Sequence, residues 1–307
     1  MSTIRASTPV EPMKFGVVSL LGRPNAGKST LLNRLVGTKL AIVSDKPQTT
    51  RNRILAVRNH KDGQVVFLDT PGIHRPLHRM NVRMLDSALE TIREVDVLGL
   101  VIDATEKPGH GDQFVLDLLS EVTIPVVLVL NKIDLVSKPK LLPIIERSSA
   151  AFAFADIVPV SALTGDNIER LEQVFLRHLP SGEPLYPQDY LTDQPERFFV
   201  GEIVREQVLH HTHAELPFAS AVVVDRFEEQ DPKGLMRLYC SILVDRESQK
   251  PIVVGRGGEM IKRIGTAARL ELERFFDARV FLDLRVKVWP GWREDDRFLD
   301  GLGVRGR

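Results

Sequence analysis

Cysteine, aromatic residues and net charge are all scarce in this sequence. Cys240 is the one cysteine among 307 residues, so no intrachain disulfide can form, and we expect a reducing compartment. It lies in an apolar run, residues 238–244, and we interpret it as a small buried side chain. Lysine plus arginine and aspartate plus glutamate number 41 each. Overall charge therefore predicts no partner, and any nucleic-acid surface has to be a local patch.

Long apolar runs are also absent. None approaches the ~18 consecutive apolar residues that a membrane-spanning helix needs. Residues 1–12 are polar and broken by prolines, without the apolar core of a signal peptide. We therefore expect a cytoplasmic protein with a disordered tail at residues 1–12. The composition, 43% hydrophobic and 27% charged, is that of a globular protein, and the length predicts about two domains.

A glycine-rich segment near the N-terminus, here called the phosphate loop, carries the strongest functional signal. It consists of Gly22, Arg23, Pro24, Asn25, Ala26, Gly27, Lys28, Ser29 and Thr30. An apolar run precedes it and a helical pattern follows it, so its backbone N–H groups can point into one hollow at a helix N-terminus. Lys28 is then expected on the β- and γ-phosphates and the Ser29 hydroxyl on Mg²⁺. The pattern predicts a nucleoside triphosphate site.

Two segments that follow have the properties of nucleotide-sensing loops. Residues 41–53, here called the switch segment, are polar and contain Thr50, whose hydroxyl can complete the magnesium shell only while a γ-phosphate is present. A solvated connection with ordinary threonines is the alternative. The second segment ends an apolar strand and consists of Asp69, Thr70, Pro71, Gly72 and Ile73. Asp69 can hold a magnesium-bound water, and Gly72 offers an unobstructed N–H to the γ-phosphate.

A tetrapeptide after the apolar run 125–130 selects the base. It consists of Asn131, Lys132, Ile133 and Asp134. Guanine presents two N–H donors on one edge, which the Asp134 carboxylate can accept together, whereas adenine lacks that pair. The Lys132 stem can lie over the purine, and Asn131 can tie the loops together. A backbone N–H after the strand 157–160, at Ser161 and Ala162, can meet the guanine carbonyl. The predicted ligands are GTP and GDP.

Strand and helix patterns alternate through residues 13–180, which is typical of a doubly wound α/β domain with a mostly parallel sheet. Prolines and a glycine then mark a linker at residues 181–194. Residues 195–290 change to the order α-β-β-α-α-β, with helices at 195–209 and 266–276 and strands at 220–226, 236–244 and 278–289. Residues 291–307 are expected as a C-terminal tail. Trp289 and Trp292 are interpreted as packing residues.

A G-x-x-G loop in the second half points to nucleic acid. Its residues and the cations that follow are Gly255, Arg256, Gly257, Gly258, Lys262 and Arg263. Glycines let a nucleic-acid backbone approach closely, and between apolar flanks in this element order they indicate an α+β K-homology (KH) domain of the second topological type. Residues 250–287 hold nine Lys plus Arg against five Asp plus Glu, a local charge of +4. An ordinary solvated helix pair explains that excess equally well.

Taken together, these motifs resemble the Era family of bacterial GTPases, within the translational GTPases of the TrmE, Era and EngA type. The resemblance covers nearly the whole chain and implies a GTPase domain joined to a type II KH domain. By the same resemblance, the partner is the 3′ end of 16S ribosomal RNA, the role is maturation of the 30S subunit, and peripheral contact with the inner membrane is reported in the family. We expect a monomer with no DNA partner.

The catalytic residues expected from these motifs are Lys28, Asn25, Thr50 and Gly72. Hydrolysis relies on positioning and on neutralising charge at the β–γ bridge. Ile73 stands where many GTPases have a glutamine that orients water, and it cannot make those hydrogen bonds, so we expect slow turnover. In related translational GTPases an asparagine at the place of Asn25 holds K⁺; a loop-capping amide is the alternative.

Two other functions remain open at this stage. One is a GTPase of another ribosome- or tRNA-processing class whose second domain binds protein. The other is an RNA-binding placeholder in which GTP hydrolysis only times release. If the second domain binds protein, RNA crosslinking should not depend on residues 255–258, whereas an RNA-binding domain predicts that it does. The placeholder function predicts that RNA affinity depends on the nucleotide state.

Overall fold

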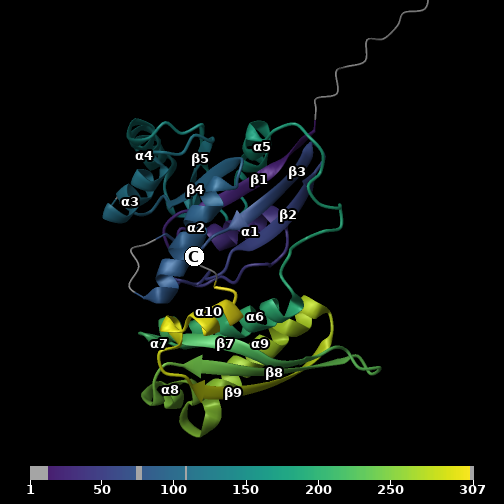
Figure 1. Cartoon of the computed structure of the whole chain (residues 1–307). Helices are drawn as coiled ribbons and strands as arrows, with labels where there is room; N and C mark the ends of the chain where they lie inside the picture. The colour runs from purple at the N-terminus through teal and green to yellow at the C-terminus, as the bar shows by residue number, and fades with distance from the viewer. Residues whose placement is uncertain (1–12, 74–77, 108, 305–307) are drawn as a thin grey trace, which may run out of the picture.

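The computed structural model describes residues 13–73, 78–107 and 109–304. The expected tail at residues 1–12 and the last three residues lie outside this range. Figure 1 shows two bodies, an N-terminal α/β domain and a smaller C-terminal α+β domain, packed against each other. The predicted fold class is confirmed by the topology of both domains.

The N-terminal domain is built on a six-stranded sheet with the order β2-β3-β1-β4-β5-β6. β2 is antiparallel to β3 and the other neighbours are parallel. Its strands are Lys14–Leu21 (β1), Ile54–His60 (β2), Gly63–Asp69 (β3), Val97–Asp103 (β4), Val126–Asn131 (β5) and Asp156–Pro159 (β6). Its helices are Lys28–Val36 (α1), Arg79–Arg93 (α2), His110–Leu119 (α3), Lys138–Ala151 (α4) and Ile168–His178 (α5), with a 3-10 turn at Ile133–Leu135.

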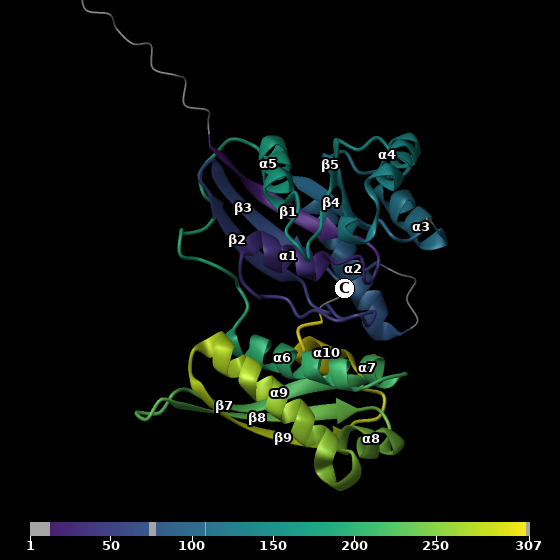
Figure 2. The ribbon, with the colours of Figure 1, turned by 180° about the vertical axis from the view of Figure 1, so that it is seen from behind.

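Helices cover both faces of this sheet. α1 and α5 lie on one face, and α2, α3 and α4 lie on the other, as the two views show (Figures 1 and 2). β5 is apolar on both sides for this reason: Val127 and Val129 join the core under α1 and α5, while Leu128 and Leu130 join the opposite core. Full burial of each such side chain stabilises the fold by about 1.5–3 kcal/mol. The parallel arrangement brings the strands' carboxyl ends, with their polar loops, to one edge.

The C-terminal domain has a three-stranded sheet, β7-β8-β9, in which β7 and β8 are antiparallel and β8 and β9 parallel. Its elements are Glu196–His211 (α6), Leu216–Ala219 (α7), Ser220–Glu228 (β7), Leu235–Val244 (β8), Lys250–Val254 (α8), Glu259–Phe276 (α9) and Arg279–Val288 (β9), with 3-10 turns at Glu247–Gln249 and Arg256–Gly258. α6 and α9 pack on one sheet face, where Leu238, Cys240 and Ile242 of β8 are buried. The expected burial of Cys240 is confirmed.

Two expectations for the C-terminal half were wrong. α9 begins at Glu259 and not at residue 266, because Gly265 is accommodated inside the helix, where it packs closely against Leu284. The segment expected as a tail from residue 291 is folded throughout its described part. It forms a 3-10 turn, Trp292–Glu294, and a helix, Asp296–Gly301 (α10), which pack with Met80 and Met84 of α2. The tail residues thus join the two domains.

Residues 181–194, predicted as a linker, lie against β2 and β3. The Val57 N–H donates to the Leu191 carbonyl at 2.8 Å, and the Gln64 side chain binds the backbone of Tyr186 at 2.8 and 2.9 Å. The rings of Tyr186 and Tyr190 stack with centroids 4.7 Å apart. These contacts cover the edge strand β2, which would otherwise expose unpaired backbone groups.

Candidate functional site

A cavity of about 450 Å³ lies at the carboxyl edge of the large sheet. Its walls come from the phosphate loop, the switch segment, Gly72, Glu106 and Lys132. The phosphate loop leaves β1 and enters α1, as its flanking patterns predict, so the first turn of α1 directs its free N–H groups at this cavity. Segments widely separated in the sequence therefore meet in one place that suits a phosphate chain.

Lys28 lies at the base of the phosphate loop and is only 6% exposed. Its ammonium donates to the carbonyls of Gly22 and Arg23 at 3.1 and 3.0 Å. Burial lowers the pKa of Lys28 to about 8, and the negative charge of Asp69 opposes this shift. A buried cation held only by carbonyls is poorly compensated, so an anionic ligand in the cavity is strongly favoured at this point.

The three residues predicted as metal ligands converge beside Lys28. The hydroxyls of Ser29 and Thr50 lie 2.7 Å apart, and Ser29 donates to Asp69 Oδ2 at 2.8 Å. Burial raises the pKa of the fully buried Asp69 to about 6, while Lys28 opposes this shift. Among the residues that the structure describes, Asp69 Oδ1 is buried and has no hydrogen-bond partner. A carboxylate and two hydroxyls with an unsatisfied oxygen among them are suitable ligands, directly or through water, for Mg²⁺.

Gly72 lies against the phosphate loop more closely than any side chain allows. A Cβ added there would come 2.8 Å from the Pro24 nitrogen and 2.9 Å from its Cα. The next N–H, from Ile73, donates to the Gly22 carbonyl at 3.1 Å, and the Ile73 side chain is buried in the core beneath α2 and α3. Ile73 therefore presents no side chain to the cavity. Thr70 is fully buried and donates to the Leu20 carbonyl, so its role is structural.

Asn131 ties together the loops that are expected to bind the nucleotide, as the sequence predicts. Its amide nitrogen donates to the Ala26 carbonyl at 2.9 Å, and its oxygen accepts from the Ala162 N–H at 3.0 Å. The Asp134 carboxylate accepts from the Ser161 hydroxyl at 2.6 Å. This brings the phosphate loop and the two expected guanine loops into contact at a single side chain.

Two acidic residues of this region were missed by sequence reasoning. The Asp103 carboxylate pairs with the Lys132 ammonium at 2.6 Å, and these groups fix the orientation of the lysine stem expected over the purine. Although burial opposes it, hydrogen bonds from Lys132 and Thr105 hold the pKa of Asp103 below its usual value. Asp103 ends β4, so the strand-end rule that found Asp69 would have found it too. Glu106 lines the cavity from the loop that follows.

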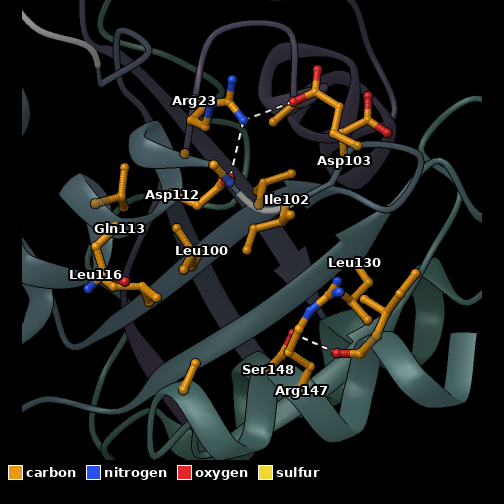
Figure 3. A pocket seen from close by; sticks show the side chains of 18 of the residues that line it. Arg23, Leu100, Ile102, Asp103, Asp112, Gln113, Leu116, Leu130, Arg147 and Ser148 are labelled. Carbon is orange, nitrogen blue, oxygen red and sulfur yellow. Dashed lines mark hydrogen bonds and ion pairs between the residues drawn. The ribbon is translucent and has the colours of Figure 1, made fainter.

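Arg23 was expected to bind nucleotide, but its side chain turns to the other side of the phosphate loop. It pairs with Glu106 at 2.9 Å and Asp112 at 3.2 Å, at the rim of a second cavity of about 540 Å³ (Figure 3). That cavity lies between α3 and α4 over an apolar floor that includes Leu100 and Leu130. Its lining contains neither Lys28 nor Ser29, whereas the smaller cavity is lined by both, so the smaller cavity fits a phosphate chain better.

The G-x-x-G loop joins α8 to α9 at an exposed corner of the C-terminal domain. Gly257 and Gly258 have φ angles of 60° and 80°, and a Cβ on either would meet no atom within 4 Å, so the backbone is open to a close approach. Arg256, Lys262 and Arg263 are exposed. In the part of the chain that the structure describes, none of these three cations has a carboxylate partner. The loop thus offers an unobstructed backbone and, among the described residues, uncompensated positive charge.

Comparison with known proteins agrees with this geometry. A family model described as a 50S ribosome-binding GTPase matches residues 17–132, and one described as a KH domain matches residues 215–293. GTPase Era from Geobacter metallireducens is 48% identical over 292 residues, covering 95% of this chain and 98% of the relative. GTPase Era from Geotalea uraniireducens is 51% identical over 290 residues, covering 94% and 97%. The chain belongs to the Era family of GTPases.

Solved Era structures also match along the full length. A structure of Era with MgGDPNP and nucleotides 1506–1542 of 16S ribosomal RNA has a TM-score of 0.92 at 40% identity, covering 95% of this chain and 99% of that one. A variant of Aquifex aeolicus Era bound to GDP and AlF₄⁻ has a TM-score of 0.91 at 39% identity, covering 95% and 100%. The whole two-domain arrangement is therefore shared with other Era proteins.

Proposed function

We propose that this GTPase binds GTP with Mg²⁺, hydrolyses it to GDP and phosphate, and holds the 3′ end of 16S ribosomal RNA through its KH domain during 30S subunit maturation. The observation that carries this proposal is the convergence of Ser29, Thr50 and Asp69 beside the buried Lys28, in a chain that also presents an open, basic G-x-x-G loop. The Era complex with MgGDPNP and 16S ribosomal RNA supports it.

In the proposed mechanism the chain acts by positioning and by charge. Lys28 exchanges its two carbonyl partners for the β- and γ-phosphate oxygens, and the phosphate-loop N–H groups surround the β-phosphate. Ser29, Thr50 and, through water, Asp69 would hold Mg²⁺, which would supply further positive charge to the phosphate oxygens. Gly72 donates its N–H toward the γ-phosphate. Since Ile73 is buried and nonpolar, no side chain at this position orients water, and turnover by the isolated protein is slow.

Guanine specificity is proposed to come from Asp134, which accepts both N–H donors of the base edge. In the structure this carboxylate accepts from the Ser161 hydroxyl. The neighbouring Ala162 N–H donates to Asn131 Oδ1 and would exchange this bond for one to the guanine carbonyl. Competition by GTP and by ATP for a fluorescent GDP analogue measures this directly. Displacement by GTP alone is the expected result, and equal displacement by ATP would refute guanine recognition.

We further propose that Asn25 holds a potassium ion that adds positive charge during hydrolysis. Its side-chain nitrogen donates to the Asp45 carbonyl at 2.8 Å, so Asn25 joins the phosphate loop to the switch segment at the wall of the nucleotide cavity. GTP turnover is compared in potassium and sodium buffers. Faster turnover in potassium that Asn25→Ala abolishes is expected, and equal rates in the two buffers contradict the proposal.

RNA binding by the G-x-x-G loop has a matched control within the chain. Gly258→Asp places an acid where RNA is proposed to lie, and Gly234→Asp makes the same change in the β7–β8 turn, where the glycine also has a positive φ (73°) and open surroundings. We expect Gly258→Asp alone to lose affinity for a 16S 3′-end RNA. Equal affinity in both variants would favour a protein partner for this domain instead.

The nucleotide state is proposed to control RNA binding, with the GTP form holding RNA and the GDP form releasing it. The switch segment, which carries Thr50, contacts the C-terminal domain directly and supports such coupling. RNA affinity is measured with GDPNP and with GDP. Weaker binding with GDP is expected, and identical affinities would refute the coupling.

We also propose a monomer that touches the cytoplasmic face of the inner membrane only peripherally, as the family resemblance implies. Within residues 13–73, 78–107 and 109–304, no helix is both long and apolar enough to cross a membrane. Co-sedimentation with vesicles of phosphatidylethanolamine and phosphatidylglycerol tests the membrane contact, and sedimentation equilibrium tests the oligomeric state. Protein that stays in the supernatant would contradict the membrane contact. A mass equal to that of a dimer would contradict the monomer.

A further inference from the structure

α6 of the C-terminal domain contacts the switch segment at its beginning. α6 lies on the side of its domain that faces the GTPase domain (Figure 2). The buried carboxylate of Glu206 accepts from the Val43 N–H at 2.8 Å and pairs with Lys39 at 2.6 Å. One turn further along α6, the His210 ring nitrogen lies 3.0 Å from the Val43 carbonyl oxygen. The first residues of the switch segment are thus fastened to a helix of the other domain.

A second contact from α6 reaches the residue next to Thr50. Arg205 is 3% exposed, and its guanidinium donates to the Thr49 backbone carbonyl. Two hydrogen bonds to the Glu202 carboxylate, at 2.7 and 2.6 Å, fix the orientation of this guanidinium. A charge-assisted bond from a side chain with a fixed orientation restricts the peptide that carries Thr49 and so the position of Thr50.

A third contact holds the residue after Thr50. Arg51 is 5% exposed and donates to the carbonyls of Ser220 and Pro217 at 2.8 and 3.1 Å. Its guanidinium also lies 5.5 Å from the ring centroid of Trp292. No carboxylate forms an ion pair with Arg51 in the described part of the chain, and its Nε is buried without a hydrogen-bond partner. Burying a cation that contacts only carbonyl groups and one aromatic face costs free energy, so we expect this arrangement to serve a function.

We propose that Arg205 and Arg51 are positioning residues for GTP hydrolysis, through which the KH domain holds Thr50 in the nucleotide site. Thr50 lies between the two contacts, and its hydroxyl is 2.7 Å from that of Ser29. Arg205 and the groups that hold Arg51 belong to the C-terminal half, so a displacement of that half displaces both neighbours of Thr50. RNA bound to the KH domain can thereby change the rate of GTP hydrolysis. This inference rests on the proposed GTP hydrolysis.

The main test measures hydrolysis by the full-length protein carrying Arg205→Ala. Displacement of a catalytic group by about 1 Å can cost on the order of 100-fold in rate, so we expect kcat to fall by at least about ten-fold. GDP needs no switch threonine, so its Kd is expected to stay within about two-fold of wild type. Arg205→Lys retains a donor for the Thr49 carbonyl and is expected to recover part of the lost rate.

A control and a milder variant keep this test decisive. Arg53→Ala removes an arginine that does not line the nucleotide cavity. Its partner, Glu94, is an exposed residue of the same domain at 3.0 Å, so this variant is expected to leave kcat unchanged. Glu202→Gln weakens the contact that orients the Arg205 guanidinium but keeps the arginine side chain, so it is expected to lower kcat less than Arg205→Ala does. Stimulation of hydrolysis by a 16S 3′-end RNA is measured for each protein, and Arg205→Ala is expected to lose it.

The outcomes separate this inference from the proposed function. A wild-type protein that hydrolyses no GTP refutes the proposed function itself. Wild-type hydrolysis with equal kcat in Arg205→Ala and Arg53→Ala overturns only the positioning role. A parallel fall in kcat and in GDP affinity, without recovery in Arg205→Lys, also overturns it, because general damage to the fold then explains the loss.

Discussion

Some residues of this protein are constrained by backbone distances as much as by side-chain chemistry. Gly72 shows this most directly, since its neighbour is the backbone of Pro24 and not a flexible side chain. A backbone neighbour cannot rotate away, so an added methyl group must displace one loop or the other. The phosphate loop and the segment from Asp69 to Ile73 are therefore coupled in position at this glycine.

We predict that Gly72→Ala lowers the rate of GTP hydrolysis by about 10- to 100-fold, because the segment from Asp69 to Ile73 is pushed away from the phosphate loop. GDP affinity should change little, since the expected guanine contacts of Asp134 and Ala162 lie elsewhere. Single-turnover hydrolysis and GDP titration measure the two effects. Gly109→Ala, where an added Cβ meets no atom within 4 Å, is the control. An unaltered rate of hydrolysis in Gly72→Ala would contradict this prediction, because it would show that the two loops can move apart without affecting the reaction.

Cys240 predicts a specific pH dependence of stability. Burial raises the pKa of its thiol from 9.0 to about 12. Between these values the unfolded thiol ionises while the folded one keeps its proton, so the unfolding free energy falls as pH rises above 9. The loss attributable to this group is about 1.4 kcal/mol per pH unit. Denaturant unfolding of wild type and Cys240→Val between pH 8 and 10 should show the steeper decline in wild type. Parallel curves would contradict the burial.

At the scale of elements, the C-terminal segment shows how a short, mostly polar stretch becomes structural. Its apolar residues are too few for a core of their own, but Trp292, Leu299 and Val304 are buried against α2 and the β7–β8 sheet face. The Trp292 indole donates to the Ala219 carbonyl at 3.1 Å, at the corner that also holds Arg51. The helix exists because two domains supply the surface that buries it.

Truncating Trp292 should therefore be costly. We predict that Trp292→Ala lowers the unfolding free energy by about 3–5 kcal/mol, through the cavity it leaves. Trp292→Phe keeps most of the apolar volume and strands only the Ala219 carbonyl, which costs about 1–3 kcal/mol. Trp289→Ala is the matched control because that ring is 43% exposed. Equal losses for Trp292→Ala and Trp289→Ala in denaturant unfolding would contradict a buried, structural Trp292.

At the scale of the whole molecule, the domains are joined by contacts on both sides of the nucleotide-sensing region. The switch segment meets α6 and β7, while α2, which follows Gly72 in sequence, meets α10. Arg83 of α2 is 6% exposed and pairs with Asp300 at 2.7 Å and Asp296 at 2.9 Å. It also donates to the Val304 carbonyl at 2.9 Å. The switch segment and the helix that follows Gly72 in sequence are therefore both in contact with the C-terminal half.

Arg83 is predicted to hold α10 against the GTPase domain. Arg83 is buried, whereas its partners Asp296 and Asp300 are exposed, so solvent screens the two ion pairs. The buried hydrogen bond from the Arg83 guanidinium to the Val304 carbonyl contributes about 1.5–3 kcal/mol, so Arg83→Ala should release α10 and raise hydrogen–deuterium exchange across residues 292–304. Arg79→Ala is the control, because Arg79 binds the same Asp296 at 3.0 Å from an exposed position on the same helix, where solvent screens the ion pair. Equal exchange in the two variants would show that Arg83 does not anchor the segment.

The sequence by itself determined the nucleotide motifs and the order of elements. The phosphate loop, the Asp69 to Gly72 turn and the Asn131 to Asp134 loop are each short and contiguous, so their backbone geometry is local. The strands that place them are apolar on both faces, and parallel strands deliver their ends to one edge. The sequence alone therefore predicts that Ser29, Thr50 and Asp69 lie close together.

Only the tertiary structure decided what joins the two halves. Arg51 and Ser220 are 169 positions apart, and no periodicity in either segment indicates the other. The same holds for the outward turn of Arg23 and for the folded segment after residue 290. Hydrophobic patterning reports which face of an element is buried, but not which element of another domain covers it. Such pairings depend on how two finished surfaces dock, and that docking places Arg205 beside Thr49.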